Sequence, residues 1–357
     1  MTFLYVIAAI LLFGILITVH EAGHFFAARL VKIPVREFAI GFGPKLLQWK
    51  RKKYETEFFL RAIPLGGYCA FYGEDDTAKE FENDPRAFNN HSVGKRLLTI
   101  IMGPVMNLIL ALVAAVMLFA LNGIPVVPEG PVKTWVESVS QGSAAQEGGL
   151  LAGDIILAVD GQMVTDNLSE LLAQQDGGTP RQFTVLRETT GGQTELTLSV
   201  TPRYDASQGR NMIGIMMSQG QEIHMRRGNL LQVLEHAGQM SWRAGTMVIN
   251  AIINLFTRGE GAGEVAGVVG ITKMIVDEIQ QTHLQGYLYL MVVISINLGL
   301  MNMLIIPGLD GSRILFLLLE ALRGKPIARE GYVHAAGMIL LFALMAFITL
   351  RDVIRLF

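Results

Sequence analysis

The sequence predicts a multi-pass α-helical membrane protein with four transmembrane helices, a cytoplasmic membrane-associated β region and one extracytoplasmic α+β domain. Three observations predict this class. Hydrophobic residues make up 51% of the 357 residues and charged residues 17%, whereas roughly a quarter of the residues of soluble domains are charged. Apolar runs long enough to cross a bilayer recur along the chain. A basic loop with strand patterns and a long acidic segment separate these runs.

Composition also excludes several classes of partner and site. The net charge is −2, from 29 basic and 31 acidic residues, so no overall basic field points to nucleic acid. Cys69 is the single cysteine, which excludes an intramolecular disulfide and a cysteine-cluster metal site. A metal site would therefore use histidine and carboxylate ligands.

Apolar runs define the predicted spans. Met1–Val19 has no charged side chain, and Leu97–Leu121 is interrupted only by Gly103-Pro104 and Asn107. The other two apolar runs are Leu284–Ile306 and Val333–Leu350. With their flanking residues we expect transmembrane helices over 1–34, 96–122, 284–322 and 333–357. A cleavable signal peptide is the alternative for the first run, but it lacks a basic start and its apolar part is too long.

A fifth uncharged stretch is shorter than a membrane-spanning helix has to be. Ala244–Thr257 has fourteen residues, which is too short to cross a hydrocarbon core of about 30 Å. It falls in the segment 226–283, where weakly amphipathic patterns predict membrane-associated helices that return the chain to the bilayer.

Orientation follows from the basic residues beside the spans. The loop from Arg29 to Arg61 holds nine basic and three acidic residues, which predicts a cytoplasmic location. The segment from Ile124 to His224 holds twelve acidic and five basic residues and is predicted to face outside. Four spans with both termini outside satisfy these signs.

Strand patterns fill the two long connections. Residues 35–95 begin with short alternating runs broken by Gly and Pro, which predicts a β region at the membrane surface. Such a sheet either packs on the bilayer or offers an edge to a partner strand. Residues 125–219 carry five strand patterns around one helical pattern, enough for a small α+β domain. The run Ser138–Gly161 within it resembles a PDZ domain.

A candidate site begins where the first apolar run ends, at His20-Glu21-Ala22-Gly23-His24. On a helix, residues four apart share a face, so the two imidazoles could hold one zinc ion. Glu21 would then reach the attacking water as general base. The alternative is a cluster that caps the helix at the membrane interface, although three ionisable groups there are costly without a function.

A third ligand has several candidates. Asp310 and Arg313 are the charged residues between Leu284 and Leu319. Asp310 is either a metal ligand or the partner of Arg313 three residues later, and the residues alone leave both interpretations open. The histidines His283 and His334, at the ends of apolar runs, are further candidates.

Several motifs follow one another along the chain: HEAGH at the end of the first span, GFGPK and IPLGGY in the next loop, GPVMN in the second span, the PDZ-like insert and NMLIIPGLDG. Taken together and in this order, they resemble the site-2 protease family of intramembrane zinc metalloproteases. The resemblance covers residue 1 to about 357. It is greatest to the bacterial branch of regulator-of-sigma-E protease type with a single PDZ domain.

The resemblance implies a role for each motif residue. It makes His20, His24 and Asp310 the ligands of Zn²⁺, Glu21 the general base and Asn302 a contact to the substrate main chain. It also assigns the strands around Gly41 and Gly43 to a β region that pairs with an unwound substrate. The chain departs from the family pattern at Ile305 and at Val268, where the family usually has proline.

The implied function is hydrolysis of peptide bonds within transmembrane segments in the bacterial cytoplasmic membrane. Implied substrates are membrane proteins, such as anti-sigma factors or signal-peptide remnants, first trimmed by an upstream site-1-type protease. The PDZ domain would bind a new C-terminus or act as a size filter. Two alternatives remain: a catalytically inactive PDZ-bearing scaffold, and a transporter whose polar residues line a path. The HExxH motif with Asp310 argues against the first, and the lack of paired repeats argues against the second.

Overall fold

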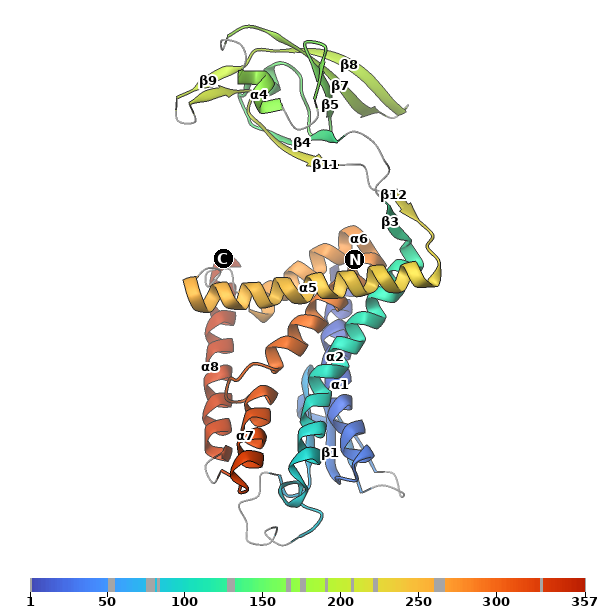
Figure 1. Ribbon diagram of the computed structural model, residues 1–357, viewed down its shortest axis with the longest axis vertical. Helices are drawn as coiled ribbons and strands as arrows, with labels where there is room; N and C mark the ends of the chain where they lie inside the picture. Colours follow the sequence, from blue (N-terminus) through green and yellow to red (C-terminus); the bar gives the residue numbers. More distant parts are fainter. Residues whose placement is uncertain are drawn as a thin grey trace. The chain divides into compact units, whose positions relative to one another are not determined.

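A computed structural model of the chain describes residues 2–50, 55–74, 81, 84–126, 132–164, 168–173, 178–189, 192–206, 209–220, 224–259, 267–327 and 330–356. The chain divides into two compact units; the colours of Figure 1 follow the sequence through both. Unit 1 consists of Met1–Ile124 and Arg227–Phe357, and unit 2 of Pro125–Arg226. Of the basic run Lys50–Lys53, the last three residues lie outside the described part.

Unit 1 is built on four long helices: α1 (Thr2–Leu30), α2 (Val93–Asn122), α6 (Val268–Asn302) and α8 (Glu330–Leu356). All four are long and apolar enough to cross a membrane. The prediction of four apolar membrane-spanning helices is therefore confirmed at this level. Side chains from three of them form one buried cluster, which includes Leu12, Leu16, Ala111, Ala115, Val292 and Ile296.

Two glycines let α1 and α2 cross closely. A Cβ on Gly23 would lie 2.1 Å from the carbonyl oxygen of Met102, and a Cβ on Gly103 would lie 2.3 Å from the ring of His24. Larger residues at either position would push the helices apart, which is why small residues favour close helix packing in membranes. The crossing brings the histidine pair of α1 directly against α2.

The predicted third span, 284–322, forms two helices rather than one. Helix α6 begins at Val268, is kinked at His283 (φ 53°, ψ −126°) and ends at Asn302. A second helix, α7 (Asp310–Arg323), follows after a short connection. Pro307 lacks a backbone N–H and Gly308 has a φ of 99°, so neither residue continues a helix. The break allows α7 to start beside α1.

Helix α5 (Leu230–Arg258) is a single 29-residue helix. A capping box between Asn229 and Gln232 starts it, and Gly259 in the left-handed conformation ends it. In Figure 1 it runs across the direction of α2 and α8. One face, with Val233 and Ala237, packs on the bundle, and another leaves apolar side chains exposed, among them Leu230, Leu231, Leu234, Trp242, Ile249 and Ile253.

The β region of unit 1 is a folded hairpin of two long strands, β1 (Val35–Lys50) and β2 (Glu57–Phe71). Positive φ angles at Gly41 (87°) and Gly43 (82°) bend β1. Residues 37–40 of β1 pair on one side with 57–60 and on the other with 67–70 of β2. Residues 67–71 therefore form an edge strand. A short 3-10 helix (Phe88–Asn90) precedes α2.

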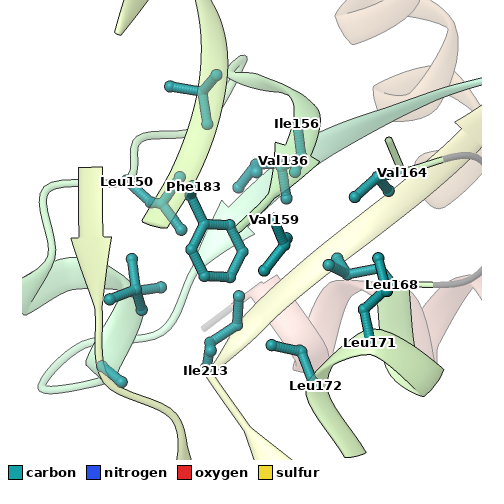
Figure 2. Close-up of a cluster of buried hydrophobic side chains, with 14 residues drawn as sticks. Val136, Leu150, Ile156, Val159, Val164, Leu168, Leu171, Leu172, Phe183 and Ile213 are labelled. Carbon is teal, nitrogen blue, oxygen red and sulfur yellow. The ribbon is translucent and has the colours of Figure 1, made fainter. Parts of the chain in front are cut away.

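Unit 2 contains a six-stranded sheet with strand order β11-β4-β5-β7-β8 and β6 beside β5. Figure 2 shows Phe183, fully buried, surrounded by aliphatic side chains from the sheet and α4. Ser143 caps α3 by accepting a hydrogen bond from the Gln146 N–H. The bounds are β3 (Ile124–Val126), β4 (Lys133–Val139), α3 (Ala144–Glu147), β5 (Ile155–Val159), β6 (Gln162–Met163), α4 (Leu168–Ala173), β7 (Arg181–Thr189), β8 (Gly192–Val200), β9 (Arg203–Asp205), β10 (Arg210–Met212), β11 (Ile215–Gly220) and β12 (His224–Arg226).

Candidate metal centre

His20 and His24 lie on one face of α1, in its C-terminal half. Their side chains point to a common place because they are one helical turn apart. Both residues are buried, with 7% and 6% of their surface exposed. Their Nε2 atoms are 3.2 Å apart. Two histidine nitrogens are thus held close together inside the helix bundle.

Asp310 reaches the same place from the far end of the sequence. It is the first residue of α7. Its Oδ2 lies 3.1 Å from His20 Nε2 and 3.5 Å from His24 Nε2. The neighbouring Gly311 makes this approach feasible, because a Cβ there would lie 2.2 Å from the carbonyl oxygen of Met303. The chain folds back tightly on the end of α6 to deliver this carboxylate.

The geometry separates the two interpretations of Asp310. Arg313, three residues later, forms an ion pair with Glu74, just beyond the end of β2. The Oδ2 atom of Asp310 faces the two histidines instead. This arrangement favours Asp310 as a ligand over Asp310 as the partner of Arg313.

The three donor atoms fit a zinc ion. In a tetrahedral zinc site with bonds of about 2.1 Å, neighbouring ligand atoms are about 3.4 Å apart. The three separations in this protein are 3.1, 3.2 and 3.5 Å. Asp310 Oδ2 is buried and has no hydrogen-bond donor. A carboxylate oxygen left in this state is costly, and a cation bound among the three atoms would compensate it.

Helix α2 contacts the other edge of both imidazole rings. His24 Nδ1 lies 3.0 Å from the carbonyl oxygen of Thr99, and His20 Nδ1 lies 3.2 Å from the side-chain amide of Asn107. Gly103, between them, leaves room for both rings. Thr99, Gly103 and Asn107 are spaced four apart and share one face of α2. The sequence patterns placed Gly103 and Asn107 in the GPVMN motif but did not connect either residue with the histidines, although the four-residue spacing opposite the HExxH motif was a usable signal.

Glu21 lines a cavity of about 340 Å³ together with His20, His24 and Asp310. The edge strand of the β region forms another wall through Gly67, Tyr68 and Cys69. The backbone N–H of Cys69 lies beside the Glu21 carboxylate. A Cβ on Gly67 would come within 3.4 Å of Glu21 Cγ. A carboxylate, a candidate metal centre and a strand edge therefore share one space.

A polar network holds the edge strand in place. The Tyr68 hydroxyl donates to Glu37 Oε2 at 2.8 Å and accepts from Arg61 at 2.7 Å. Burial and the hydrogen bond to the Glu37 carboxylate raise the pKa of Tyr68 above its usual value. The phenol thus stays a neutral donor that links the edge strand to β1.

The other predicted site residues fall in two groups. Asn302, at the end of α6, lines the cavity, and its amide lies 3.4 Å from His20 Nε2. Gly41 and Gly43 bend β1 and are not among the described residues that line the cavity. The strand that lies against the cavity is Gly67–Phe71 of β2, which sequence patterns alone did not distinguish from its neighbours.

The two alternative histidine candidates lie outside the donor set. His334, in α8, is 3.3 Å from the Ser312 hydroxyl and packs against the ring of Phe316. His283 occupies the kink of α6. Among the described residues, the group of His, Cys, Asp and Glu side chains close enough to hold a metal consists of His20, His24 and Asp310.

Comparison with known proteins identifies the family. The sequence model of Peptidase family M50 matches residues 8–346 of the chain. The chain belongs to peptidase family M50. The resemblance to site-2 proteases is thereby confirmed, and an M50 chain is a zinc-dependent metalloprotease.

Relatives of this M50 chain match along nearly its whole length. A Clostridium acetobutylicum protein named as a zinc metalloprotease is 34% identical over 99% of this chain and 98% of its own length. The zinc metalloprotease RasP of Oceanobacillus iheyensis is 28% identical over 99% of both chains. The "Probable membrane metalloprotease ARASP2, chloroplastic" of Arabidopsis thaliana is 31% identical over 96% of this chain and 78% of its own length. With four apolar helices of spanning length, the M50 chain is a membrane metalloprotease.

Proposed function

We propose that this membrane metalloprotease hydrolyses peptide bonds within the membrane-spanning segments of other proteins, using Glu21 as general base and His20, His24 and Asp310 as zinc ligands. The observation that carries the proposal is the position of the site. All three donor atoms and Glu21 share a cavity walled by α1 and α6, which are long and apolar enough to span a membrane. A substrate that reaches this cavity from the bilayer is a membrane segment.

Each residue then has a defined task. Bound zinc supplies Lewis-acid polarisation of the scissile carbonyl and of the attacking water. Glu21 takes the proton of that water and passes it to the leaving amine. Cys69 lies beside Glu21 in the cavity wall, where its N–H would favour the ionised carboxylate. Asn302 presents an amide to the same space, where it would hold the substrate main chain.

The edge strand offers a place for an unwound substrate. The Tyr72 N–H donates to the Pro34 carbonyl, on the β1 side, whereas the Phe71 N–H donates to the Glu74 carboxylate. Alternate residues of a strand point to opposite sides, so 67, 69 and 71 present backbone groups away from β1. A substrate strand added there would satisfy the backbone groups that unwinding exposes.

Unit 2 and the orientation of the chain complete the proposal. Unit 2 is a PDZ domain on the outer side of a bacterial cytoplasmic membrane, with both chain termini on that side and the β region in the cytoplasm. A groove beside edge strand β11 is lined by Leu168, Leu172, Ile215 and Met217, which suits an added peptide strand.

Membrane proteins trimmed by an upstream protease, such as anti-sigma factors or signal-peptide remnants, are the substrates. The exposed apolar face of α5 rests on the membrane surface.

Cleavage of a tagged single-span protein by the purified full chain in detergent tests the proposal. Wild type, Glu21→Gln, and wild type treated with a zinc chelator and then resupplied with zinc would be compared. We expect cleavage by wild type, no cleavage by Glu21→Gln despite wild-type zinc content, and restoration by added zinc. Cleavage that persists in Glu21→Gln would overturn the assignment of the base. A cut mapped outside the spanning segment would overturn the substrate class.

A further inference from the structure

Asn107 is a fully buried amide in the middle of an apolar helix. None of its surface is exposed. Its Nδ2 lies 3.2 Å from His20 Nδ1, and its Oδ1 has no hydrogen-bond partner. An unpaired amide oxygen in a membrane-spanning segment is costly, since neither water nor lipid can donate to it. The placement of this residue therefore calls for an explanation.

Metal ligation by His20 determines which atom of the Asn107 side-chain amide has to face the imidazole ring. His20 directs Nε2 toward Asp310 and His24. A ligating nitrogen offers its lone pair, so in a neutral imidazole the proton sits on the other nitrogen, Nδ1, which must donate. The partner of Nδ1 then has to be an acceptor.

The amide of Asn107 satisfies this requirement by a half turn. Its oxygen and nitrogen exchange places when the side-chain amide rotates by 180°, and the two orientations have nearly the same shape. After the rotation, Oδ1 faces His20 Nδ1. This rotation gives the His20 Nδ1–H the acceptor that it needs, and it gives Asn107 Oδ1 the donor that it lacks.

His24 shows the same arrangement with a backbone group. Its Nδ1 lies 3.0 Å from the carbonyl oxygen of Thr99, which can only accept. Both histidines would therefore carry their proton on Nδ1 and present Nε2 to the same point. The difference is that a main-chain atom fixes His24, while a replaceable side chain fixes His20.

We propose that Asn107 is a positioning residue of the metal centre. Its Oδ1 accepts the Nδ1–H of His20, which sets the tautomer and the ring orientation and so strengthens zinc binding. This inference rests on the proposed ligand set of His20, His24 and Asp310. It assigns to α2 the support of both histidine ligands, although α2 supplies no ligand itself.

A second hydrogen bond at the same residue provides a matched control. Ser295 of α6 is fully buried, and its hydroxyl donates to the Asn107 backbone carbonyl at 2.8 Å. Ser295→Ala removes this helix–helix contact but leaves the amide and the imidazole in place. It should lower the unfolding temperature without changing the affinity for zinc.

Zinc affinity of the purified full chain in detergent, measured by competition with a chromophoric chelator, is the test. Wild type, Asn107→Ala, Asn107→Asp and Ser295→Ala would be compared. We expect Asn107→Ala to bind zinc about 10- to 100-fold more weakly. Asn107→Asp, which keeps an acceptor and no donor, should retain wild-type affinity or exceed it. Cobalt bound in place of zinc gives a second readout, because the visible spectrum of Asn107→Ala should differ from the wild-type spectrum.

Three outcomes would overturn the inference. Wild-type affinity and spectrum in Asn107→Ala would show that the amide does not position His20. An equal loss of zinc affinity in Asn107→Ala and Asn107→Asp would mean that packing or the Nδ2 donor matters, and that the acceptor does not. If Asn107→Ala does not fold, the zinc affinity of Asn107→Asp alone decides this question. Wild type that binds no zinc would overturn the proposed ligand set as well, which distinguishes that failure from the failure of Asn107 alone.

Discussion

The two ends of α7 each carry a largely buried carboxylate, with 16% of the Asp310 side chain and 11% of the Glu320 side chain exposed, and their surroundings differ in one respect. At the C-terminal end, Glu320 forms a bidentate pair with Arg96 of α2, whose Nη1 lies 3.1 Å from Glu320 Oε2. At the N-terminal end, Asp310 Oδ2 has no donor and faces two histidine nitrogens. Burial is common to both carboxylates. The missing donor is what marks Asp310 as a candidate ligand.

Unit 2 contains a carboxylate of the same type as Glu320. Asp154 is 1% exposed, and both its oxygens accept from Arg187 at 2.7 Å. This carboxylate raises the pKa of Arg187 above its usual value. Fully satisfied carboxylates thus act as structural ties in both units, and α7 combines one such tie with one unsatisfied group.

Removal of Asp310 should have the largest effect. Asp310→Ala is expected to abolish proteolysis and to lower zinc affinity by more than the roughly 10- to 100-fold typical of residues that only support a ligand. The unfolding temperature of the zinc-free protein should hardly fall, because the Oδ2 atom that the substitution removes has no hydrogen-bond donor. Metal content after dialysis, by mass spectrometry, measures the first effect. Wild-type zinc content in this variant would contradict the ligand assignment.

Removal of Glu320 should affect stability rather than metal. Glu320→Leu leaves the Arg96 guanidinium buried without a counter-charge, at an expected cost of about 3–5 kcal/mol. Replacing both residues by apolar ones, Arg96→Met with Glu320→Leu, should recover most of that loss. Thermal unfolding in detergent gives both values. If the single variant unfolded at the wild-type temperature, the contrast between the two ends of α7 would fail.

The smallest effect is expected at Arg313. Arg313 is the more exposed partner of its ion pair with Glu74, with 31% of its side chain exposed against 7% for Glu74. Arg313→Gln keeps an amide donor for the Glu74 carboxylate, so it should cost less stability than Glu320→Leu. Zinc affinity should stay within a factor of about three of wild type, because the Asp310 Oδ2 atom faces the two histidines and Arg313 pairs with Glu74. Chelator competition and thermal unfolding test both statements. A large gain or loss of zinc affinity would mean that Arg313 tunes the ligand directly.

Local sequence patterns predicted those parts of the protein that depend on local chemistry. The four apolar helices follow from uncharged runs, because a bilayer of about 30 Å requires about 20 apolar residues per helix. His20, Glu21 and His24 follow from a four-residue spacing that any helix converts into a shared face. The strands and helix of unit 2 follow from alternation and from turn residues.

Other features depended on how distant segments meet. Leu284–Ile306 is one apolar run, yet α6 starts earlier and ends at Asn302, and Pro307 and Gly308 keep the connection to α7 non-helical. Gly41 and Gly43 belong to the motif shared with the family, but Gly67 and Cys69 line the cavity. Alternation along β2 is the same in every segment, so the sequence could not tell which part would become the edge strand.

By itself, the sequence determined that this chain has apolar runs long enough to span a membrane and a histidine pair on one helical face, and it left the role of Asp310 open. Those properties are set by residue type and spacing within one segment. Tertiary structure decided which partner each polar group receives: Asp310 meets the histidines and Arg313 meets Glu74, while Asn107 meets His20 across 87 residues. The physical reason is that a buried polar group must find its partner in space, and in this bundle the close crossing of α1 and α2 at Gly23 and Gly103 determines which partners lie within reach.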